Sequence, residues 1–293
     1  MAREKYRFNT PAGRVFDVFN VVLMVAIAVV ALIPFVFVLA GSFATEAELA
    51  TRSFFLWPET FSLDAYEAIF TSSAFLRALV TTILVTAVGT LVQLTLTAAM
   101  AYPLSKANLP GGRLILSLIV FTMVFGGGMI PTFLVVKDLG LLNNYWALIL
   151  PMAINPFSLI IIKNFFQQLP AELEESAKID GANELQTLWS IVLPLSKPVL
   201  ATFALFYAVG IWNDFMSPLL YLNDSAMWTL QMFLRQVTVA TDLSVVEQDP
   251  TQLPPAQGIK FAVIIVATLP IVLFYPFLQK HFAKGMLIGS VKG

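Results

Sequence analysis

The sequence is poor in the residues that most enzyme sites require. It contains no cysteine, which excludes disulfides, thiolate metal sites and cysteine nucleophiles. Its one histidine, His281, belongs to no H-x-x-H or carboxylate–histidine cluster that could bind a metal. General-base catalysis needs a cleft and an orienting partner, so we expect His281 to lie among solvent or lipid headgroups. No G-x-x-x-x-G-K-[ST] loop is present, so the chain itself should not bind ATP.

Charge is also scarce. Charged residues make up 12% of the 293 residues, against roughly 25% in soluble domains. The net charge of −1 provides no basic face for nucleic acid. Hydrophobic residues make up 58% of the chain. This composition predicts a protein that spans a membrane, and its long apolar stretches predict an all-α membrane protein.

Six apolar stretches are candidates to cross a hydrocarbon core, which takes about 20 residues. They cover residues 18–39, 78–104, 114–136, 139–162, 199–213 and 261–279. The first is too long for the ~7–15-residue apolar region of a signal peptide, and no A-x-A site follows it, so we expect it to stay in the protein. The fifth is the least regular, because Asp214 interrupts it.

The charges between these stretches predict the orientation. If the N-terminus is cytoplasmic, all but five of the seventeen Lys and Arg lie on the cytoplasmic side. The exceptions are Arg52, Arg77, Lys137, Arg235 and Lys260. This bias matches the positive-inside rule, and six spans return the C-terminus to the cytoplasm. The chain then divides into a cytoplasmic tail (1–17), a transmembrane domain (18–280) and a second cytoplasmic tail (281–293).

The cytoplasmic loop between the fourth and fifth spans, residues 164–197, is helical in pattern. Pro170 can open a helix, acidic residues crowd its first turns, and Gly181 can end it in a left-handed conformation. A second short helix should run from Asn183 to Val192 and stop at Pro194. Its predicted apolar face consists of Leu185, Leu188, Trp189 and Val192. By shape alone this is a well-capped connecting loop.

The same loop carries a longer pattern: Glu175-Ser176-Ala177, three residues, Gly181, nine residues, and then Ile191-Val192-Leu193-Pro194. It resembles the E-A-A signature loop of binding-protein-dependent ABC importer permeases, with Ser176 as the one departure. The resemblance runs from about the second span to the C-terminus. It implies a type I importer permease whose loop docks on a separate ATPase. The implied coupling residues are Glu174, Glu175, Ser176, Ala177, Asp180, Gly181, Ile191, Leu193 and Pro194.

Two further stretches, residues 126–157 and 195–222, resemble the carbohydrate-uptake branch and are most similar to permeases for alginate- or pectin-type oligosaccharides. This resemblance implies a multi-pass protein of the inner membrane that works by alternating access. The implied partners are a second, homologous permease, two cytoplasmic ATPase subunits, an extracytoplasmic binding protein and the carbohydrate substrate. ATP and magnesium would bind the ATPases, with no cofactor in this chain.

Proline, glycine and asparagine interrupt the later spans. The third holds Gly126-Gly127-Gly128 and Pro131, the fourth Pro151 and Asn155-Pro156, the fifth ends in Trp212-Asn213-Asp214, and the sixth holds Pro270 and Pro276. Backbone groups freed at such breaks must be covered by protein or line a wet cavity. One interpretation is kinked spans whose polar side chains satisfy the backbone. The other is a sugar pathway built from Asn155, Trp212, Asn213, Asp214 and Tyr221.

The two long outer loops, residues 40–77 and 214–258, either contact a binding protein or act as spacers. Three rival functions stay open. A permease for another small solute is the first, but anionic solutes would favour basic spans. An ion-coupled secondary transporter would show inverted repeats and buried carboxylates, and neither is evident. A membrane enzyme would need a catalytic constellation that the sequence lacks.

Overall fold

The structure is a computed structural model that describes the backbone of residues 11–244 and 257–289, and side chains within 13–239 and 257–273. Most of the predicted N-terminal tail, residues 245–256 of the second outer loop, and the side chain of His281 lie outside this description. Among the described residues, regular structure is helical apart from one isolated bridge between Ala44 and Phe61. The predicted all-α class is confirmed.

The chain forms two compact units. The first comprises residues 1–71 and 238–266, and the second comprises residues 72–237 and 267–293. The first unit contains α1 (Pro11–Ser42), α2 (Glu46–Thr51), α3 (Asp64–Thr71) and the start of α15 (Gln257–Gly289). Its core joins the end of α1 to α15 through Ala40, Leu49, Phe55 and Phe261. Gly41 permits this approach, because a Cβ there would lie 2.5 Å from the Phe261 ring.

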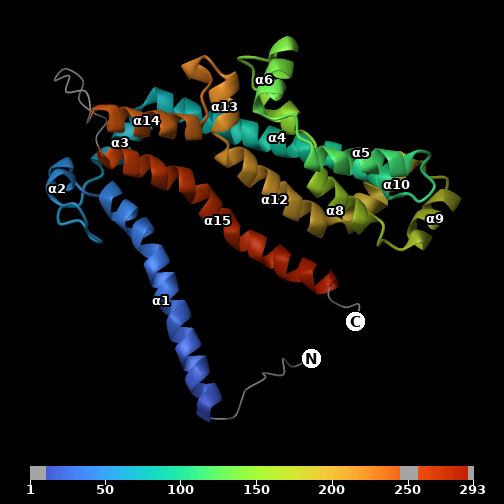
Figure 1. Ribbon diagram of the computed structural model, residues 1–293, viewed down its shortest axis with the longest axis horizontal. Coiled ribbons are helices and arrows are strands. Elements are labelled where there is room, and N and C mark those ends of the chain that lie inside the picture. The colour runs from blue at the N-terminus through green and yellow to red at the C-terminus, as the bar shows by residue number, and fades with distance from the viewer. Residues whose placement is uncertain (1–10, 245–256, 290–293) are drawn as a thin grey trace. The chain divides into compact units, whose positions relative to one another are not determined.

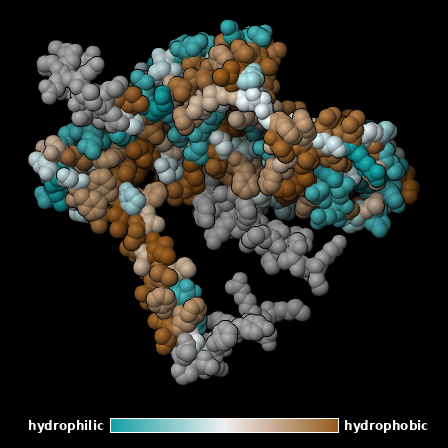
Figure 2. Space-filling view, viewed as in Figure 1, coloured by the Kyte–Doolittle hydropathy of each residue, from teal (hydrophilic) through white to brown (hydrophobic). Residues whose placement is uncertain are grey.

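Helix α1 confirms the first apolar stretch as a single long helix. Its apolar part, Gly13–Ser42, has 30 residues, or about 45 Å at the usual helical rise, which exceeds the hydrocarbon thickness. Most of its side chains up to Leu39 are exposed and hydrophobic, and Figure 2 shows them as a brown surface along the helix. A helix that is apolar all round is typical of contact with lipid.

A buried carboxylate holds the loop after α2. Glu48 accepts hydrogen bonds from the backbone amides of Glu59 at 3.0 Å and Thr60 at 3.3 Å, and it pairs with Arg52 at 2.5 Å. The Glu59 amide, more than any other neighbour, holds the pKa of Glu48 below its ordinary value. This part of the predicted outer loop is therefore an ordered structure.

The second unit is built on α4 (Ser73–Ser105), which packs along α8 (Pro156–Phe166) and α12 (Lys197–Asn213) (Figure 1). Its main core cluster includes Ala101, Leu159, Ile162, Val192 and Phe203. The other elements are α5 (Gly112–Val124), α6 (Met129–Asp138), α7 (Trp146–Ile149), η1 (Leu150–Met152), α9 (Ala171–Ile179), α10 (Glu184–Thr187), η2 (Leu188–Val192), α11 (Leu193–Leu195), α13 (Met216–Tyr221), η3 (Ser225–Met227) and α14 (Leu230–Ser244).

The second predicted span is one helix, but the third and fourth are bent pairs. α5 and α6 meet at 116° across the glycines, and residues 146–152 meet α8 at 56°. Gly128 adopts φ +83°, which favours glycine, and Pro156 can start α8 but has no amide to continue an earlier helix. A third bent pair, Glu184–Leu195 with Lys197–Asn213, has an angle of 84°. Pro270 does not break α15, which continues through it.

Candidate functional site

The first helix of the loop at residues 164–197, α9, is bounded by strong local signals. Pro170 lies just before it, and Leu173 donates a hydrogen bond to the Pro170 carbonyl at 3.3 Å. Gly181 ends it with φ +83°. The Ala182 amide donates to the Ala177 carbonyl at 2.9 Å, which together with the Gly181 amide forms a Schellman cap. The prediction of a short helix that Gly181 terminates is confirmed.

The second helix of the loop begins with a capping box. The Asn183 side chain accepts from the Gln186 amide, and the Gln186 side chain accepts from the Asn183 amide, both at 2.9 Å. The helix then widens into a π-turn, Leu188–Val192. The predicted stop at Pro194 is wrong, because α11 includes this residue. Pro194 lies in the first turn of α11, where a missing amide hydrogen is tolerated.

The predicted apolar face of this second helix splits in two. Leu188 and Val192 are buried in the core with α4, α8 and α12, whereas Leu185 and Trp189 are exposed. A π-turn adds a residue to the turn and shifts the register of the face, so the spacing of an ordinary helix misplaced these two side chains. The second helix of the loop therefore packs into the core of the helix bundle. α9 lies at one end of this bundle, beyond α8 (Figure 1).

Polar contacts join α9 and α10 to the end of α4. Lys106 forms an ion pair with Glu174. The Tyr102 hydroxyl donates to Glu184 Oε2 at 2.8 Å, and Lys178 Nζ lies 2.8 Å from Glu184 Oε1. Lys178 first, and Tyr102 second, lower the pKa of Glu184, and Glu184 in turn raises the pKa of Lys178. The sequence analysis missed Tyr102, Lys106 and Glu184.

The motif residues differ in exposure. Glu175, Ser176, Asp180 and Gly181 are exposed, whereas Ala177 is 7% exposed and packs inward. Ile179, between them, is 87% exposed although the loop is polar. Pro194 is exposed, and Glu174, Ile191 and Leu193 are half-buried. α9 therefore presents charged groups and two large apolar side chains, Leu173 and Ile179, on its surface, and hydrogen bonds cap its backbone.

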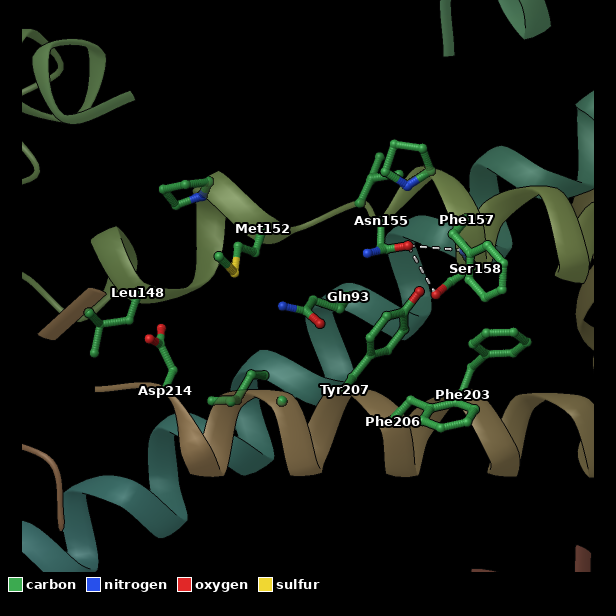
Figure 3. A pocket seen from close by; sticks show the side chains of 15 residues that line it. Gln93, Leu148, Met152, Asn155, Phe157, Ser158, Phe203, Phe206, Tyr207 and Asp214 are labelled. Carbon is green, nitrogen blue, oxygen red and sulfur yellow. Dashed lines mark hydrogen bonds between the residues drawn. The ribbon is translucent and has the colours of Figure 1, made fainter. Parts of the chain in front are cut away.

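A cavity of about 510 Å³ lies between α4, α8 and α12. Figure 3 shows five polar side chains around it, from Gln93, Asn155, Ser158, Tyr207 and Asp214. The rest of its lining is apolar or backbone and consists of Leu148, Pro151, Met152, Ile154, Pro156, Phe157, Phe203, Phe206, Gly210 and Ile211. The break before α8 opens this space, and it brings together two of the predicted pathway residues, Asn155 and Asp214.

Both of these residues also support the backbone. Asn155 Oδ1 accepts from the Ser158 amide at 3.0 Å and caps α8. Asp214 Oδ1 accepts from the amides of Met216 at 3.0 Å and Ser217 at 3.1 Å. In the described part of the chain, Asn155 Nδ2 and Asp214 Oδ2 have no partner, so each side chain keeps one group for a ligand.

The other three predicted pathway residues do not line this cavity. Trp212 is buried and donates from Nε1 to the Ala267 carbonyl at 2.9 Å. Asn213 Nδ2 donates to the Val209 carbonyl at 2.8 Å, and Tyr221 is buried with its ring stacked 6.2 Å from that of Phe133. These contacts fit the interpretation in which polar side chains form hydrogen bonds with backbone groups of the broken spans and aromatic side chains pack against them.

Gln93 is the cavity residue that the sequence analysis missed. It lies in the middle of α4 and is only 4% exposed. Its amide reaches into the cavity between Asn155 and Asp214 (Figure 3) and has no hydrogen-bond partner among the described residues. Nearby, the Tyr207 hydroxyl is already bonded to Thr97 Oγ1 at 3.0 Å. A glutamine inside a predicted span is itself a signal of function, because such residues avoid lipid.

The chain matches one protein family over nearly its whole length and is similar to several known proteins. The profile described as "Binding-protein-dependent transport system inner membrane component" matches residues 1–288, which includes the first span. Protein LplC of Bacillus subtilis (strain 168) is 64% identical over 295 residues, covering 100% of both chains. The polygalacturonan/rhamnogalacturonan transport system permease protein YtcP of the same organism is 53% identical over 286 residues, covering 96% of this chain and 99% of YtcP.

A solved structure also resembles the chain. It is the crystal structure of a bacterial ABC transporter involved in the import of the acidic polysaccharide alginate. One of its chains superposes with a TM-score of 0.86 at 33% sequence identity. The match covers 94% of this chain and 99% of that one.

Proposed function

Since this chain belongs to the family of binding-protein-dependent transport system inner membrane components, we propose that it is one permease subunit of an ATP-driven importer of carbohydrate. Six spans, with both termini in the cytoplasm, would place residues 164–197 at the cytoplasmic face. ATP and magnesium would bind two separate ATPase subunits. A second, homologous permease would complete the pathway, and an extracytoplasmic binding protein would deliver the solute to the two outer loops.

One observation carries the coupling role: an exposed, capped helix, α9, is joined to a second helix that is rooted in the bundle core. Displacement of α9 by an ATPase would pass along α10 to Val192, which packs in the main core cluster, and then through α11 to α12. The Lys106–Glu174 and Tyr102–Glu184 contacts would carry part of the same displacement to α4. Closely packed elements transmit such movements because they do not deform continuously.

The proposal of a carbohydrate substrate is supported by the relatives and by the cavity. YtcP is named for pectic polysaccharides, and the structural neighbour belongs to an alginate importer. The cavity combines amide and carboxylate groups with the rings of Phe157, Phe203 and Phe206. Sugars present hydroxyls to such polar groups and C–H faces to such rings. We therefore propose an oligosaccharide of alginate or pectin type, with Asn155 and Asp214 among the residues along its path.

The test is transport by the assembled complex in proteoliposomes. With its ATPases, second permease and binding protein, the chain should take up pectin-derived oligosaccharides only when ATP is supplied on the ATPase side. Omission of the ATPases should abolish uptake. Uptake at an unchanged rate without ATPases would refute the proposal and would favour a secondary transporter.

A further inference from the structure

The cavity between α4, α8 and α12 contains one charged group, and that group is negative. Its fifteen lining residues include Asp214 but no lysine, arginine or histidine. Sites that recognise carboxylates use arginine or lysine in paired, charge-assisted hydrogen bonds. A sugar carboxylate in this cavity would meet no cationic side chain among the described lining residues, and it would lie near the carboxylate of Asp214.

The unpaired groups in the cavity suit hydroxyls instead. The Gln93 amide offers two donors and an acceptor, Asn155 Nδ2 offers donors, and Asp214 Oδ2 is an acceptor. The Gln93 side chain is 4% exposed and its amide opens into the cavity, so a group inside the cavity has to bond it. Gln93 is thus placed to be satisfied by a ligand that both donates and accepts, as a sugar hydroxyl does.

We infer that this chain binds an uncharged face of the transported sugar in this cavity, with Gln93 and Asp214 as residues that determine specificity against carboxylates. In an acidic oligosaccharide, the carboxylates must then point away from this chain. The inference rests on the proposed function, because it names the part of the carbohydrate that this site accepts. The cavity volume of about 510 Å³ lies within the range of small-molecule sites.

The experiment compares two ligands that differ at one group per sugar ring, a carboxylate in one and an uncharged hydroxymethyl group in the other. They are an oligogalacturonide and its carboxyl-reduced derivative, which has the same linkage and length. Uptake of each is measured with the full assembly in proteoliposomes, per amount of complex assembled. The ratio of the two uptakes is insensitive to any loss of folding, because both sugars are carried by the same preparation.

Three variants test the residues. Asp214→Asn keeps an oxygen for the Met216 and Ser217 amides but removes the charge, so acid uptake should rise at least about threefold relative to the reduced sugar. Gln93→Leu should lower uptake of both sugars by roughly fivefold or more, through the loss of one or two hydrogen bonds. Asn108→Leu makes a similar amide-to-leucine change at an exposed position in the turn between α4 and α5 and serves as the control.

An unchanged ratio in Asp214→Asn, or an effect of Gln93→Leu no larger than that of Asn108→Leu, would overturn the inference while leaving the importer intact. Uptake of neither sugar by the unaltered assembly would overturn the proposed carbohydrate function, and this inference with it.

Discussion

Substitution of Gly181 can separate the backbone requirement of α9 from its proposed contact with an ATPase. Gly181 adopts φ +83°, and no heavy atom lies within 4 Å of the position that a Cβ would take. A Cβ at this position therefore meets conformational strain but no steric clash with the described residues. The left-handed conformation costs a non-glycine residue about 1–2 kcal/mol.

The comparison uses Gly181→Ala and Gly181→Trp. Both should weaken the cap of α9 by the same ~1–2 kcal/mol, because their strain has the same backbone origin. The thermal stability of the isolated permease should thus fall by similar small amounts in the two variants. If an ATPase surface approaches α9 closely, only the tryptophan will clash with it. We expect ATPase co-purification and ATP-driven uptake to fall at least about tenfold further in Gly181→Trp, which corresponds to ~1.4 kcal/mol.

The matched control is Gly140→Trp. Gly140 also has a positive φ, of +68°, and open space around its Cβ position. It lies at the start of the fourth predicted span, which the predicted topology places at the face opposite α9. The Gly140→Trp variant should bind the ATPase as the unaltered permease does. Equal ATPase binding by Gly181→Trp and Gly181→Ala would show that α9 is not the docking site, and the proposed coupling route would have to be abandoned.

Three further predictions follow from contacts in the structure. Glu184→Gln should weaken the contacts with Tyr102 and Lys178 and so loosen the attachment of the loop to α4. Sugar uptake should then fall more than the rate of ATP hydrolysis. An unchanged ratio of sugar transported to ATP hydrolysed would count against a coupling role. Because the pKa of Glu48 is lowered, its stabilisation of the loop after α2 is present above pH ~4.5 and is lost as pH falls through the lowered pKa. Limited proteolysis of that loop should therefore accelerate in acid, and Glu48→Gln should be cut faster at neutral pH with no such dependence; the same cleavage rates in both proteins would refute this. Trp212→Phe should destabilise the permease by roughly 0.5–1.5 kcal/mol, because it removes the buried hydrogen bond from the indole Nε1 to the Ala267 carbonyl; a thermal melt that does not move would contradict this contribution.

The local signals in the sequence predicted much of the fold. Long apolar runs identified α1 and α4, and glycine and Asn-Pro pairs identified the positions of the breaks. The motif that ends at Pro194 and the left-handed Gly181 predicted the capped helix α9. Each of these features depends on residues within a few positions of one another, because backbone preferences and caps act over one or two helical turns.

What the sequence could not decide is which distant side chains meet. Glu174 and Lys106 are separated by 68 positions, and Trp212 reaches a carbonyl 55 positions away. Residue types alone assigned Trp212 to a pathway, whereas its indole packs and bonds inside the bundle. Gln93 is a candidate site residue because it lines the cavity beside the break in the fourth predicted span, a position that the sequence did not predict. These pairings depend on the angles at which helices cross and bend, and those angles are set by the packing of the whole core and not by any local stretch.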